Sequence, residues 1–123
     1  MLNLDTHILV GALSGTLKPG ERDLLAEESW GVSAIVLWEL TMLSQRGRIE
    51  VDLHSTALDR ALSGIQVWPI DLRVCRHLGL LDFSSDPADE VIAATSMAYA
   101  APLVTRDRKL RASQVVPLAV KGH

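Results

Sequence analysis

Cysteine is almost absent from this sequence of 123 residues, since Cys75 is the only one. A single thiol excludes a disulfide framework and a thiolate metal cluster, and it is typical of a protein kept in a reducing compartment, so a cytoplasmic location is expected. A long apolar run is absent too. The N-terminal stretch MLNLDTHILVGAL is interrupted by Asp5 and His7 and has no basic leader. It therefore predicts neither a signal peptide nor a membrane span.

The common phosphate-binding and nucleophile motifs are also missing. The stretch GALSG has neither the spacing of a Walker loop nor that of a dinucleotide fingerprint, and no serine lies in a nucleophile elbow. Aromatic residues make up only 4% of the chain, and no basic residues are interleaved with its tryptophans. That pattern is typical of packing rather than of base stacking.

Positive charge is scarce overall but locally concentrated. The formal net charge is −3, which argues against a simple phosphate-binding surface, although a bound cation would change this balance. The largest basic cluster lies near the C-terminus and comprises Arg106, Arg108, Lys109 and Arg111. Hydrophobic residues reach 48%, which indicates a deeply buried sheet or an apolar partner surface.

Apolar, β-branched runs alternate with segments of helical spacing. Strands are expected at about residues 1–4, 31–33, 65–70, 102–105 and 115–119, with helices between them. The clearest helix start has Asp86 as N-cap, Pro87 at the first helical position and Asp89 at the third. Strands this apolar favour a parallel sheet covered on both faces. The sequence therefore predicts an α/β fold, a three-layer α/β/α sandwich, as one domain over residues 1–123.

Four acids fall where this fold would bring them together. Asp5 follows the first strand, and Asp107 follows the fourth after one arginine. Asp89 lies in the first turn of one helix, and Glu39 about one and a half turns into another. Loops at the carboxyl ends of parallel strands form ligand sites. Four carboxylates there repel one another unless a cation holds them, and their hard oxygens suit Mg²⁺ or Mn²⁺ and metal-assisted phosphoryl chemistry.

Each acid also has a simpler interpretation. Asp5 and Asp107 could cap the helices that follow them. Asp89 could form a capping box with Asp86 or interact with the helix dipole. Glu39 could lie at the surface, although the stretch SAIVLWELTML places apolar residues on nearly every side of it. Four acids together at strand ends are stronger evidence for a cation site than any one of them alone.

Four stretches resemble, in order and spacing, the motifs of the PIN domain family, and within it the small VapC-type toxins of toxin–antitoxin pairs. They are LDTH, SAIVLWEL, DPADEVIAATSMA and PLVTRDRKL. The resemblance implies a PIN-like parallel five-stranded sheet between helices. It also implies that the four acids are the catalytic, metal-binding residues of a Mg²⁺- or Mn²⁺-dependent endoribonuclease.

The same resemblance extends to neighbouring residues and to partners. It implies that Thr6 and Thr105 are accompanying hydroxyls and makes Asp86 an acid behind the metal ligands. The basic residues near the C-terminus are candidate phosphate contacts: Arg106, Arg108, Lys109 and Arg111. A cognate antitoxin and a toxin homodimer are implied as partners. Ala88 and Glu90 depart from the third motif of close relatives, where an aromatic residue and an arginine are common.

Two other functions remain open at this stage. A receiver-type signalling module also has acids that bind Mg²⁺ at the ends of its strands. Such a module requires an adjacent pair of acids after its first strand, and the stretch LNLDTHI has no such pair. A PIN fold with only a binding role would bind metal without cutting RNA.

Overall fold

The computed structural model describes residues 1–119 as a parallel sheet with helices on either side. In those residues the sheet has four strands in the order β3-β2-β1-β4, and every pairing is parallel. The elements in chain order are β1 (Leu2–Leu4), α1 (Thr6–Ser14), α2 (Pro19–Glu27), β2 (Trp30–Ser33), α3 (Ala34–Gln45), α4 (Thr56–Leu62), β3 (Gln66–Trp68), α5 (Leu72–Leu78), α6 (Pro87–Tyr99), β4 (Leu103–Val104) and α7 (Arg108–Ala112).

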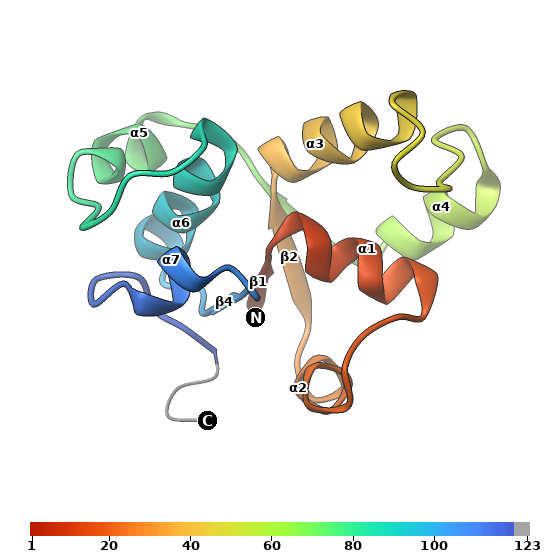
Figure 1. Ribbon diagram of the computed structural model, residues 1–123, viewed down its shortest axis with the longest axis horizontal. Helices are drawn as coiled ribbons and strands as arrows, with labels where there is room; N and C mark the ends of the chain where they lie inside the picture. The colour runs from red at the N-terminus through yellow and green to blue at the C-terminus, as the bar shows by residue number, and fades with distance from the viewer. Residues whose placement is uncertain (120–123) are drawn as a thin grey trace.

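The three-layer arrangement predicted from the sequence is confirmed. Figure 1 shows α5, α6 and α7 on one side of the strands and α1, α3 and α4 on the other. Burial of the central strands follows from this arrangement, because helices cover both faces of the sheet there. Leu4 of β1, Val32 of β2 and Leu103 of β4 are all buried in one cluster with Ile8 and Ile92. Among residues 1–119 no helix is both long and apolar enough to cross a membrane.

The predicted fifth strand, residues 115–119, is not a strand over the part that the structure describes. It contributes one parallel bridge, between Leu103 and Leu118, with the amide of Leu103 donating to the carbonyl of Pro117. The amides of Val115 and Val116 instead donate to the hydroxyl of Ser113, which bends the chain. Pro117 has no N–H to add to a ladder. The sheet therefore has four strands within residues 1–119, not five.

The third strand lies at the edge of the sheet and is more exposed than predicted. The run IQVWPI reads as a buried strand, but Val67 and Ile70 are 41% and 44% exposed, and only Trp68 of β3 is buried. An edge strand has a neighbour on one side only, so an apolar sequence does not by itself ensure burial.

Trp68 packs directly over a glycine in the neighbouring strand. A Cβ at Gly31 of β2 would lie 2.4 Å from Cη2 of the Trp68 indole, a distance that real contacts do not reach. We predict that Gly31→Ala displaces the indole and lowers the free energy of unfolding by about 1–3 kcal/mol, the usual cost of overpacking. Urea denaturation measures this. Gly64→Ala is the control, because no described atom lies within 4 Å of its added Cβ; equal stabilities for the two variants would contradict the prediction.

Candidate functional site

Asp5 lies at the point where β1 ends and α1 begins. Its Oδ1 accepts a hydrogen bond from the backbone amide of Thr6 at 2.7 Å, so the simpler interpretation of Asp5 as a helix cap is correct. Its Oδ2 accepts a second hydrogen bond, from Oγ1 of Thr105 at 2.6 Å. The residue is only 5% exposed. Each carboxylate oxygen has a second lone pair, so the cap does not exclude a ligand role.

Strand register explains why Thr105 reaches Asp5 across 100 residues of sequence. Leu4 of β1 is paired with Val104 of β4, and the next residues along these parallel strands are Asp5 and Thr105. The same hydroxyl accepts a hydrogen bond from the backbone amide of Asp107 at 3.0 Å. Asp107 in turn caps α7, where its Oδ1 accepts from the amides of Lys109 and Leu110. Thr105 therefore connects two of the predicted acids.

Glu39 is joined to the same group through a second threonine. Its Oε1 accepts a hydrogen bond from Oγ1 of Thr6, the residue after Asp5. Glu39 is half-buried, and the neighbouring Trp38 is 56% exposed. The expectation that apolar neighbours enclose Glu39 on nearly every side is therefore wrong, because one face of α3 is open. Two threonine hydroxyls and their backbone neighbours thus link Glu39, Asp5 and Asp107.

Asp89 interacts with the other three acids through their negative charges. Burial raises the pKa of Asp89 most, and the negative charges of Asp5, Asp107 and Glu39 raise it further, while a hydrogen bond from Ser85 opposes them. The four predicted acids are therefore near enough for the charges of three of them to act on the fourth, Asp89. They do not form a ready-made ligand set, since no three His, Cys, Asp or Glu side chains within residues 1–119 are placed to hold a metal ion together.

A buried asparagine holds Asp5 and Asp89 on neighbouring elements. Nδ2 of Asn3 donates to the carbonyl of Ile92 at 3.1 Å and to Oγ of Ser96 at 2.8 Å, which ties β1 to α6. Asn3 and Asp5 lie on the same face of β1, because side chains alternate along a strand. That face meets the helix whose first turn carries Asp89.

The raised pKa of Asp89 predicts a pH-dependent stability. The unfolded chain ionises this carboxyl at its ordinary pKa, whereas the folded chain ionises it only at a higher pH. The folded state therefore loses stability as the pH rises through that higher pKa. We predict that Asp89→Asn raises the melting temperature of the metal-free protein at pH 7 and that this gain shrinks as the pH falls through the raised pKa. The side chain of Asn keeps an oxygen that accepts the hydrogen bond from the hydroxyl of Ser85. A gain that does not change with pH, measured by thermal denaturation, would contradict the prediction.

The helix α6 begins where expected, but the alternative interpretation of Asp86 and Asp89 as a capping box is wrong. Asp86 is the N-cap residue, but in the described structure its side chain accepts no capping hydrogen bond. Ser85 makes the side-chain hydrogen bonds at the start of α6 instead. Its hydroxyl donates to Asp89, and its amide donates to Oε2 of Glu90 at 2.9 Å. Asp86 is exposed and lines an open depression together with Asp89, Asp107 and Arg108.

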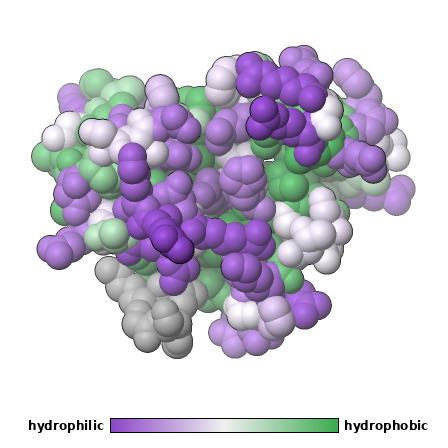
Figure 2. Space-filling view, viewed as in Figure 1, coloured by the Kyte–Doolittle hydropathy of each residue, from purple (hydrophilic) through white to green (hydrophobic). Residues whose placement is uncertain are grey.

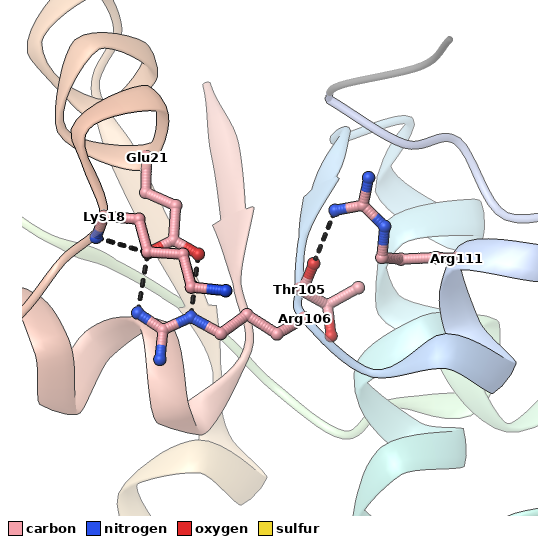
Figure 3. Close-up of polar contacts among 5 residues, drawn as sticks. All are labelled: Lys18, Glu21, Thr105, Arg106 and Arg111. Atoms are coloured by element: carbon pink, nitrogen blue, oxygen red, sulfur yellow. Dashed lines mark hydrogen bonds and ion pairs between the residues drawn. The ribbon is translucent and has the colours of Figure 1, made fainter. Parts of the chain in front are cut away.

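Two of the candidate phosphate contacts, Arg106 and Arg108, lie in different places. Arg108 is exposed and borders the depression beside Asp89 and Asp107. Arg106 reaches toward α2, where Nε and Nη2 donate to the two carboxylate oxygens of Glu21 at 2.7 and 2.6 Å (Figure 3). This ion pair lowers the pKa of Glu21, and the charge of Arg106 is already balanced.

Ser85 and Glu21 are the polar residues that sequence reasoning missed. Ser85 directly precedes the Asp-Pro pair, a place where a serine reads as an ordinary cap or loop residue. Glu21 reads as an acid in the first turn of α2, and its carboxylate does accept from the amide of Lys18. Its pairing with Arg106, 85 residues away, has no local sequence signal.

Comparison with known proteins agrees with this fold. The sequence matches the PIN domain family over residues 3–114. Similar solved structures include a VapBC2 complex from Rickettsia felis bound to a promoter DNA fragment, with a TM-score of 0.75, 22% identity and 96% and 97% of the two chains covered. Others are a toxin–antitoxin complex from Klebsiella pneumoniae (0.69, 21%, 91% and 91%) and a DNA-bound VapBC from Salmonella typhimurium (0.67, 21%, 96% and 97%). Comparison with curated protein sequences finds no match.

Proposed function

The chain belongs to the PIN domain family, and from this premise we propose that it is a metal-dependent endoribonuclease that acts as the toxin of a toxin–antitoxin pair. One observation supports this most: Asp5, Glu39, Asp89 and Asp107 come from four separate segments, and the charges of the other three add to the effect of burial in raising the pKa of Asp89. A structural protein gains nothing from such repulsion, whereas a cation site requires it.

The donor set fits Mg²⁺ or Mn²⁺, because all four side chains offer hard carboxylate oxygens. When bound, the ion would polarise a phosphodiester oxygen and lower the pKa of a water molecule. Asp5 lies at the centre of this set, since it is hydrogen-bonded to the hydroxyl of Thr105 and precedes Thr6.

The remaining residues have positioning and binding roles. Thr6 and Thr105 donate to Glu39 and Asp5, which fixes the orientation of these carboxylates. Arg108, exposed at the depression, is placed to contact a substrate phosphate. The products would carry a 5′-phosphate and a 3′-hydroxyl.

A cognate antitoxin and a second copy of the chain are the proposed protein partners. The similar complexes from Rickettsia felis and Salmonella typhimurium are named VapBC, and the one from Klebsiella pneumoniae is a toxin–antitoxin complex. Large apolar side chains exposed on the monomer agree with protein interfaces, among them Trp38, Ile70 and Leu72. Purification from the native operon tests both partners, and a monomer that purifies without any companion protein would contradict them.

Incubation of the purified protein with total RNA and Mg²⁺ or Mn²⁺ tests the function. We expect new 5′ ends at defined positions, and none after chelation of the divalent cation. Metal binding without any cleavage would instead support a PIN fold with a binding role only, and would contradict the nuclease.

A further inference from the structure

A second cleft opens next to the four acids, and the proposed chemistry does not use it. It lies between α2 and the segment that follows β4, and its volume is about 740 Å³. Binding sites for small ligands have volumes of about 300–1,000 Å³. Apolar side chains line part of it, including Leu24 of α2 and Leu103 and Val104 of β4.

Two residues connect this cleft to the acid site. Thr105 lines the cleft, and its hydroxyl donates to Asp5. Arg108 borders both the cleft and the depression that contains Asp89 and Asp107. A chain molecule lying across the acids and Arg108 would therefore enter the cleft directly.

The two walls of the cleft carry opposite charges. The segment after β4 contributes Arg106, Arg108 and Arg111, and Arg111 also donates to the carbonyl of Thr105. Figure 3 shows Arg106 reaching across to Glu21, with Lys18 beside it and Arg111 on the opposite side. Figure 2 shows strongly hydrophilic residues gathered over α7 and across the front of the molecule beside it.

The opposite wall, helix α2, carries mostly acids, with one cation, Lys18, at its N-cap. Glu21, Asp23 and Glu27 all line the cleft from this helix. Glu21 is already paired with Arg106, so Asp23 and Glu27 are the acceptors available to a ligand. A carboxylate is a good acceptor for the amino group of a base, such as N4 of cytosine, and uracil has no such group.

We propose that this cleft holds one unpaired nucleotide of the RNA strand, next to the bond that is cut, and that it favours a base with an amino group over uracil. The proposal rests on the proposed function. The three parts of a nucleotide match this cleft: an anionic phosphate for Arg108 and Arg111, an apolar base face for Leu24 and amino donors for the acids of α2.

Gly20 provides a way to block the cleft without disturbing the fold. It lines the cleft in the first turn of α2, and within residues 1–119 no atom lies within 4 Å of the place its Cβ would take. Gly20→Trp fills space at the opening, whereas Gly20→Ala fills almost none, and both replace glycine by a residue with a higher helix propensity. The pair separates occlusion of the cleft from any change in the helix.

The experiment measures binding of CMP and UMP to the metal-free protein by NMR titration. We expect CMP to bind about tenfold more tightly than UMP, and Gly20→Trp to weaken CMP binding about tenfold relative to Gly20→Ala, in line with the loss of one base contact. With single-stranded RNAs that differ in one base beside the cut, cleavage by Gly20→Ala should follow the same preference.

Failure of this proposal is distinguishable from failure of the proposed function. Equal CMP affinities in the two variants, or equal affinities for CMP and UMP, overturn the nucleotide cleft even if RNA is cleaved. Loss of the antitoxin by Gly20→Trp with unchanged CMP binding also overturns it, because the cleft would then take a protein segment. CMP binding that depends on Gly20 supports the cleft, and an absence of cleavage in the same protein would contradict only the nuclease.

Discussion

Replacing Asp5 by Asn is expected to lower RNA cleavage by at least about a hundredfold while the domain stays folded. Asn has the same shape as Asp, and its carbonyl oxygen still accepts from the amide of Thr6, so α1 keeps its cap. What is lost is the negative charge at the centre of the acid group and one strong ligand for a divalent cation.

Single-turnover cleavage of a defined RNA measures the effect, and circular dichroism with thermal denaturation checks the fold. Asp59→Asn is the matched control, since Asp59 is an exposed acid in α4 on another part of the molecule. Full activity of the Asp5 variant would refute its assignment. Equal losses in both variants would show that the assay responds to net charge alone.

Thr105→Val is expected to reduce the cleavage rate by about 10–100-fold, the usual cost of removing a group that orients a metal ligand. The hydroxyl of Thr105 donates to Asp5 and accepts from the amide of Asp107, and valine, which has nearly the same shape, can do neither. We expect the Mn²⁺ concentration for half-maximal activity to rise as well, because the carboxylate of Asp5 is no longer held in place.

Thr105→Ser should restore most of the activity, since serine keeps the hydroxyl. Thr41→Val is the control, because the hydroxyl of Thr41 donates only to the carbonyl of Leu37 within its own helix. A Thr105→Val variant with wild-type rate and Mn²⁺ dependence would contradict the positioning role, and a serine variant as weak as valine would assign the effect to packing.

The positions of the acids could be predicted because they depend on local rules. A parallel sheet places the residues after its strands at one edge, so Asp5 and Asp107 follow from the positions of β1 and β4 alone. The helix start at Asp86 follows from the Asp-Pro pair, which places Asp89 in the first turn of α6. Glu39 lies about one and a half turns into α3, which begins after β2 at the same edge.

The connections among the acids could not be predicted because they depend on register and on distant pairings. Thr105 meets Asp5 only because Leu4 pairs with Val104, and a shift of one residue would turn its hydroxyl away. Arg106 meets Glu21 only through the tertiary fold. Prediction from hydrophobicity failed at residues 115–119. There the hydroxyl of Ser113 accepts hydrogen bonds from nearby backbone amides, and these replace the strand pairing that the apolar sequence would favour.

Mn²⁺ binding, followed by the electron paramagnetic resonance signal of the free ion, tests the central claim most directly: that four carboxylates from separate segments hold one cation site. The account predicts that the wild-type protein binds Mn²⁺ and that Asp5→Asn, Glu39→Gln, Asp89→Asn and Asp107→Asn each weaken binding, while Asp59→Asn does not. Binding that none of the four substitutions changes would contradict it.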